Sequence, residues 1–217
     1  MTSLVLNLTK PGEQASKLQL NLNKNEVFTI KLAWDEKSSA SKTDLDLHAI
    51  VGINTGAGAK AGAFEDILST YNVRRRIGGQ EVGVLDKKSD GSFEIHGGAL
   101  VHSPDAQDGL AEGDDEWIRI DPAKLTTPSQ GHLEIPLVAM IHAASGARRF
   151  ADVKNARVTV INSSGRELMS ATLSDQFGEF IGVQMGSILI EAGGKASFAS
   201  VGVGFNGDFN TVLGHFS

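Results

Sequence analysis

The chain has 217 residues, of which 41% are hydrophobic and 21% charged, and its formal net charge is -6. This composition is that of an ordinary globular protein able to bury a core, and it excludes the polar, highly charged class of disordered chains. Because the chain contains no cysteine, disulfide scaffolds, thiolate catalysis and Cys-ligated zinc or iron–sulfur sites are excluded as well.

Alternation of apolar and polar residues dominates the chain and predicts β-strands. In chain order, the expected strands are 4–8, 17–23, 27–34, 93–101, 117–121, 132–142, 156–162, 166–173, 180–192 and 196–205. Helical signals are confined to short segments at 63–68 and 147–155, and the Gly- and Ala-rich stretch 52–66 is expected to be a flexible insertion loop. Many short strands separated by turns predict an all-β sandwich or barrel, which at this length forms a single domain over residues 1–217.

The N-terminal sequence MTSLVLNLTK lacks a basic region leading into a long apolar stretch. No run of the sequence approaches the ~18 apolar residues that a membrane-spanning helix needs. We therefore expect a cytoplasmic protein that does not insert into a membrane.

The negative charge is concentrated in one segment. Residues 102–121 hold seven acids and one base, whereas acids and bases balance in the rest of the chain. Such a surface argues against duplex nucleic acid as a partner. A run of like charge is often no more than a solvated loop, so the window DAQDGLAEGDDE (105–116) needs a second observation before it indicates a site.

That observation is the sequence TDLDLHA, in which Asp44 and Asp46 alternate with leucines. On a strand, period two places both carboxylates on one side. Hard cations such as calcium take six to eight oxygen ligands, and crowded carboxylates without a cation repel one another. The acidic window has the length of an EF-hand loop, but Leu110 stands where that loop requires glycine and the flanks are strand-like. The sequence therefore predicts a hard-cation site of another kind.

Four segments resemble, in order, those of TerD-type proteins of the tellurite-resistance and stress-response group: LAWDEKSSASKTDLDLHA, HSPDAQDGLAEGDDEWIRID, FADVKNARVTVIN and VGVGF. The similarity extends from about residue 25 to residue 206. Its most specific part is the loop that ends in EGDDE. The resemblance implies a two-sheet β-sandwich, with short helical segments in its connections, that binds calcium through the acidic loop and the Asp-x-Asp segment.

Carried over position by position, the resemblance implies a set of carboxylate ligands. His48 stands where the family has a third Asp and Ala106 where it has Asn, while Asp108 replaces a Thr and adds a carboxylate. One ligand is thus lost and another gained, which leaves the number of bound ions open. The expected calcium ligands are Asp44, Asp46, Asp105, Asp108, Glu112, Asp114, Asp115 and Glu116.

Two other patterns in the sequence do not predict binding sites. Imidazole suits zinc, copper or nickel, but the histidines form no tight His-x-His pair, so none is assigned as a ligand. GVGFNG has the spacing of a dinucleotide fingerprint, with Gly202, Gly204 and Gly207. Only ten residues follow it, too few for the helix, second strand and distal acid of that fold. These glycines are expected instead to permit a bend or a close approach of strands.

The favoured hypothesis is a non-enzymatic calcium-binding scaffold or sensor of the stress response, with an unknown protein partner and an open oligomeric state. One alternative is a hydrolase that uses a divalent ion as Lewis acid, which would need an open coordination position beside a pocket. Another is a calcium-dependent glycan-binding module, whose binding would be lost in chelator. The sequence does not predict tellurite chemistry, because the chain lacks the thiols and the intact cofactor motif that oxyanion reduction would be expected to use.

Overall fold

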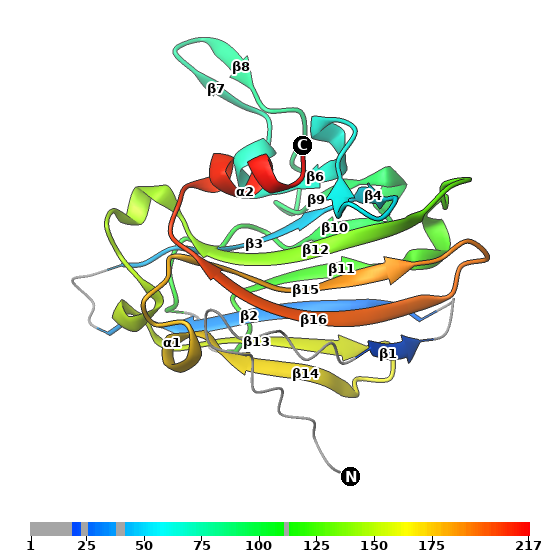
Figure 1. Cartoon of the computed structure of the whole chain (residues 1–217). Coiled ribbons are helices and arrows are strands. Elements are labelled where there is room, and N and C mark those ends of the chain that lie inside the picture. The colour runs from blue at the N-terminus through cyan, green and yellow to red at the C-terminus, as the bar shows by residue number, and fades with distance from the viewer. Residues whose placement is uncertain (1–18, 23–25, 38–41, 111–112) are drawn as a thin grey trace.

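Two antiparallel sheets pack face to face and form the body of the protein (Figure 1). The structure, a computed structural model, describes residues 19–22, 26–37, 42–110 and 113–217. The larger sheet has the order β1 (Gln19–Leu22), β16 (Ala196–Phe205), β15 (Gly182–Ile190), β12 (His132–Ile141), β3 (Leu45–Ile50), β6 (Ile67–Leu68), with β4 (Gly52–Asn54) paired to β12 and β5 (Ala59–Lys60) paired to β4. The second sheet has the order β14 (Glu167–Thr172), β13 (Lys154–Asn162), β2 (Phe28–Asp35), β11 (Glu116–Ile120), β10 (Leu100–His102), β9 (Phe93–Ile95).

Short helical turns occupy the connections. They are η1 (Phe64–Asp66), η2 (Thr70–Asn72), η3 (His96–Gly98), η4 (Pro122–Lys124), η5 (Ala143–Ser145), η6 (Phe150–Asp152) and the helices α1 (Leu173–Gln176) and α2 (Phe209–His215). A third, two-stranded sheet consists of β7 (Arg75–Ile77) and β8 (Gln80–Val82). The predicted all-β two-sheet sandwich is thus confirmed. Among the described residues, no helix has the length and apolarity to cross a membrane.

The main core lies between the two sheets. Strand β2 shows how the alternation builds it, since Phe28, Ile30, Leu32 and Trp34 are all buried while the residues between them are half-exposed. Full burial of an apolar side chain contributes roughly 1.5–3 kcal/mol, so one strand of this kind anchors its sheet to the other.

Strand β3 is buried on both faces. Leu45, Leu47 and Ala49 belong to the core between the sheets, whereas Ile50 belongs to a second cluster beneath α2 that includes Phe209. The predicted period of two is therefore present, but the face that carries Asp44 and Asp46 is covered rather than open to solvent.

Several expectations need correction. The segment 93–101 is two strands, because His96, Gly97 and Gly98 all have positive φ (50°, 61° and 77°) and turn the chain between β9 and β10. The stretch 52–66 is not a structureless loop, since it forms β4, β5 and η1. The expected strand 4–8 lies outside the described residues.

The expected short helical segments are confirmed. The segments 63–68 and 147–155 contain single 3-10 turns, η1 and η6. After GVGFNG the described residues form one short helix, α2, and no second strand follows it, so the dinucleotide fingerprint stays excluded. Asp208 caps α2, because its side chain accepts a hydrogen bond from the Thr211 backbone N–H at 3.0 Å.

Candidate metal centre

The acidic residues meet where the free edge of β3 approaches the second sheet. Among the described strands, β6 pairs with β3 at Ala49 and Ile50 alone, so the earlier part of that edge has no strand beside it. There the Leu47 N–H donates to Oε2 of Glu116 at 2.9 Å, and Nε2 of His102 lies 3.1 Å from the Leu47 carbonyl oxygen. Side chains of β10 and β11 thus contact the backbone of β3 and bring the two acidic motifs together.

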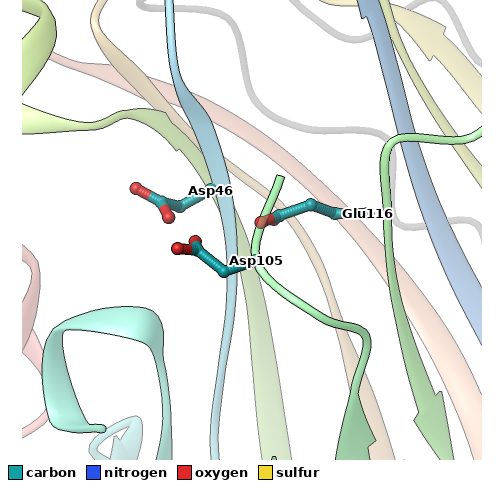
Figure 2. A group of neighbouring side chains, drawn as sticks. All are labelled: Asp46, Asp105 and Glu116. Carbon is teal, nitrogen blue, oxygen red and sulfur yellow. The ribbon is translucent and has the colours of Figure 1, made fainter. Parts of the chain in front are cut away.

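Three carboxyl groups gather at this point: Asp46 of β3, Asp105 of the loop after β10, and Glu116 at the start of β11 (Figure 2). One oxygen from each lies within 4.8 Å of the others. Asp46 and Glu116 are completely buried, and Asp105 is half-buried. We call this group the acidic triad.

Burial and like charge disfavour ionisation in and beside the triad. The pKa of Asp46 is raised well above its ordinary value by burial and then by Asp44. Glu116 has a pKa raised by burial and then by Asp46. The pKa of Asp44 rises to about 7 through burial and then through Asp105 and Asp108. A cation would favour the charged form of every member of this set.

The hydrogen bonds of the triad are incomplete. Oδ1 of Asp46 accepts from the Thr70 hydroxyl at 2.7 Å. Within the described part of the chain, Oδ2 of Asp46 and Oδ1 of Asp44 are buried without a hydrogen-bond partner. Leaving a buried carboxylate oxygen without a partner is strongly unfavourable. Protonation of these carboxyl groups, or a bound cation, would remove that cost.

The donor set fits a hard cation. Calcium is bound by oxygens at about 2.3–2.6 Å, so that two ligands on opposite sides of an ion lie about 5 Å apart. The 4.8 Å limit within the triad matches that span. Asp46, Asp105 and Glu116 would therefore hold the ion, with Asp44 close enough to share in its charge balance.

The other predicted ligands occupy different positions. Lys42 Nζ donates to Asp108 at 2.5 Å, and Lys31 Nζ donates to Asp114 at 2.5 Å. Lysine ammonium groups thus neutralise both carboxylates outside the triad. Glu112 lies outside the described residues.

Asp115, near the end of the loop, has a buried side chain. Its Oδ2 accepts from the Trp34 backbone N–H at 2.9 Å. Its Oδ1 has no partner among the described residues, and burial raises the pKa of Asp115 to about 6. Trp34 also donates through Nε1 to the Thr43 carbonyl at 2.9 Å. This tryptophan therefore joins the start of the Asp-x-Asp motif to the end of the acidic loop.

His48 is not a member of the acidic triad, and its ring packs against α2. Its ring centroid is 4.6 Å from that of Phe209, and burial lowers its pKa. His142 approaches Asp44, with Nδ1 3.6 Å from Oδ2. The sequence reasoning missed Thr70 and the two lysines, because a single polar residue 24 positions from Asp46, or a lysine on a distant segment, leaves no local signal.

A family model described as "TerD domain" matches residues 91–216, more than half of the chain. Two proteins of Bacillus subtilis (strain 168) are similar over 83% of this chain and 93% of their own length: general stress protein 16U, 27% identical, and the uncharacterized protein YceE, 26% identical.

Two crystal structures share the fold. The protein of unknown function SAV2460 aligns with a TM-score of 0.67 at 16% identity, covering 88% of this chain and 96% of that one. SCO6318 from Streptomyces coelicolor A3(2), described as a homologue of telluride resistance protein (TerD), aligns with a TM-score of 0.64 at 16% identity over 87% of this chain and 95% of that one.

Proposed function

The chain belongs to the TerD family, and from this premise we propose that it is a non-enzymatic calcium-binding protein that acts as a scaffold or sensor in a stress response. The observation that carries the proposal is the buried acidic triad, whose oxygens are close enough to share one ion and include an unpaired buried oxygen of Asp46. Calcium supplies positive charge to such a site; it is not assigned a chemical step.

The ion would act on the order of the acidic loop. Asp105 and Glu116 flank the loop, and Asp46 lies on a strand of the other sheet. A cation held by all three would tie the loop to β3 and relieve the repulsion among the acids. Calcium occupancy is thereby converted into loop order, which a protein partner can recognise.

We expect one ion at the triad. The carboxylates of Asp108 and Asp114 already have ammonium partners, Lys42 and Lys31, so a second ion would have to displace a lysine. The sequence left the number of ions open, and these lysine partners are the reason for proposing a single one.

The biological role rests on the relatives. One curated relative is named general stress protein 16U, and one structural relative is described as a homologue of telluride resistance protein. We extend a stress-related role to this chain, in the cytoplasm and through a protein partner. The absence of cysteine supports a role apart from the reduction of tellurite itself.

Calorimetric titration tests the proposal. Protein stripped of metal with chelator is titrated with calcium and, separately, with magnesium. We expect about one calcium per chain and weaker binding of magnesium, since magnesium demands a tight octahedron and releases its water reluctantly. Absence of calcium binding, or a calcium-dependent hydrolase activity of the loaded protein, would contradict the proposal.

A further inference from the structure

The strands β7 and β8 form an arm that stands away from both sheets (Figure 1). Its base is fixed: Val73 and Leu85 are buried and bridged, and Arg74 forms an ion pair with Asp86 at 3.1 Å. Its tip is a two-residue Gly78–Gly79 turn, with φ of 59° and 84°, as a tight hairpin requires. The arm is therefore an extension held firmly at one end.

One face of the arm carries two exposed apolar side chains, Ile77 and Val82, beside Arg75 and Gln80. The register pairs Arg75 with Val82 and Ile77 with Gln80, which places these four side chains on the same face. Ile77 is 58% exposed and Val82 is 38% exposed. A two-stranded hairpin is marginally stable in water by itself, so a partner that covered Ile77 and Val82 would stabilise the arm.

An apolar groove lies between α2 and the segment 61–72. Figure 1 shows α2 at the same end of the molecule as the arm. It consists of two hollows of about 460 Å³ and 360 Å³, both lined by Phe64, Ile67 and Leu213. Phe64 is 64% exposed, the most exposed of the large apolar side chains that the structure describes. Two exposed acids, Glu65 and Asp208, border the groove.

We propose that a second copy of this chain occupies the groove, with the β7–β8 arm of each copy lying against the α2 groove of the other across a two-fold axis. Each chain carries both halves of the contact near one end: an arm with the exposed side chains of Ile77 and Val82, and an apolar groove. With a two-fold axis the arm–groove contact forms twice, and the assembly closes as a dimer instead of growing into a polymer. The interface is thus isologous.

Charge supports the same pairing. On the face of the arm that carries Ile77, the exposed charged residue is Arg75, and the groove presents Glu65 and Asp208. Opposite charge at the rim of an interface favours encounter and fixes orientation. The proposed contact between arm and groove is therefore apolar at its centre, where Ile77 lies against Phe64, and charged at its edge.

Sedimentation velocity on the full chain tests the proposal. The wild type should pass from a 22.9 kDa monomer to a dimer as concentration rises from about 1 to 300 µM, the range in which weak specific interfaces form. The double variant Ile77→Ser, Val82→Ser should raise the dimer Kd at least tenfold. Its matched control is Val203→Ser, which removes a side chain of 53% exposure from β16 and should leave the dimer unchanged.

A crosslink locates the contact, because the chain has no cysteine of its own. Ile77→Cys protein mixed with Phe64→Cys protein should form a disulfide-linked heterodimer under mild oxidation, and neither variant should crosslink as efficiently by itself. Crosslinking of Ile77→Cys alone would mean that arm meets arm, and a wild type that stays monomeric at 300 µM would mean that arm and groove serve another partner. Either result overturns the proposal. The dimer is expected in calcium and in chelator alike, so this test is independent of metal binding.

Discussion

Replacement of Asp46 by Asn separates an ion site from a solvated acidic patch. The Asn side chain still offers an oxygen to the Thr70 hydroxyl, which donates to Asp46 at 2.7 Å, so the change removes charge with little change of shape. In chelator the variant should be as stable as the wild type or more stable, because burial and Asp44 already hold the pKa of Asp46 high. In calcium it should lose the stabilisation that the wild type gains.

The magnitude follows from linkage. A ligand at a hundredfold excess over its Kd stabilises the folded state by about 2.7 kcal/mol. For a chain of this size that corresponds to about 5–11 °C in melting temperature. If loss of one of the three carboxylates weakens binding a hundredfold, the same calcium concentration contributes about 0.4 kcal/mol, which is about 1–2 °C.

Thermal melts followed by circular dichroism, in calcium and in chelator, measure both states. Glu191→Gln removes an exposed acid from a turn and should keep the full calcium response. Asp114→Asn removes a carboxylate paired with Lys31 and should keep most of it. The reasoning fails if Asp46→Asn and Glu191→Gln respond to calcium alike, because the buried acids would then not share an ion.

Three further results are expected. In chelator the melting temperature should fall as pH rises from about 4 to 7. The pKa values of Asp44 (about 7) and Asp115 (about 6) are raised in the folded chain, which therefore holds protons that the unfolded chain has released. Melts in saturating calcium over the same pH range should show a smaller fall. Gly109→Ala should destabilise the protein by about 1–3 kcal/mol in chemical denaturation, because the added Cβ would lie 2.4 Å from a carbon of the Trp34 ring; it should also weaken calcium binding in calorimetry. The control Gly214→Ala in α2 has open space around the added Cβ and should be neutral or stabilising by up to about 1 kcal/mol. In chelator, denaturation should find Glu116→Gln close to the wild type, because it keeps an acceptor for the Leu47 N–H, and Glu116→Ala less stable by about 1–3 kcal/mol.

Much of the sandwich was predictable because its strands follow simple alternation. The segment 27–34 predicted β2 almost to the residue, and 196–205 coincides with β16. The pattern failed where backbone conformation interrupts it, since FEIHGGALV continues to alternate across a turn that the φ values of Gly97 and Gly98 impose. The β7–β8 arm was not predicted either, because its residues face solvent and carry little apolar periodicity.

The candidate site was predictable in composition and not in geometry. The sequence indicates which segments are acidic, but Asp46 and Glu116 come from different sheets and are 70 positions apart. Their approach depends on how β3 and β11 lie across the sandwich. The pairing of Lys42 with Asp108 is equally non-local. Local patterns therefore give a list of acids, and the fold divides that list into a buried triad and carboxylates neutralised by lysine.

Glu116 would couple ion binding at this site to the stability of the contact between the two sheets. One of its oxygens accepts from the Leu47 N–H at 2.9 Å, at a stretch of the β3 edge where no described strand lies alongside. The carboxylate therefore performs a task that a neighbouring strand performs elsewhere in the sheet. The same carboxyl group belongs to the acidic triad. A cation that stabilised its negative charge would therefore also stabilise the hydrogen bond by which it links the two sheets. An ion held only by a surface loop would order that loop, whereas an ion held here would stabilise the junction of the sandwich itself.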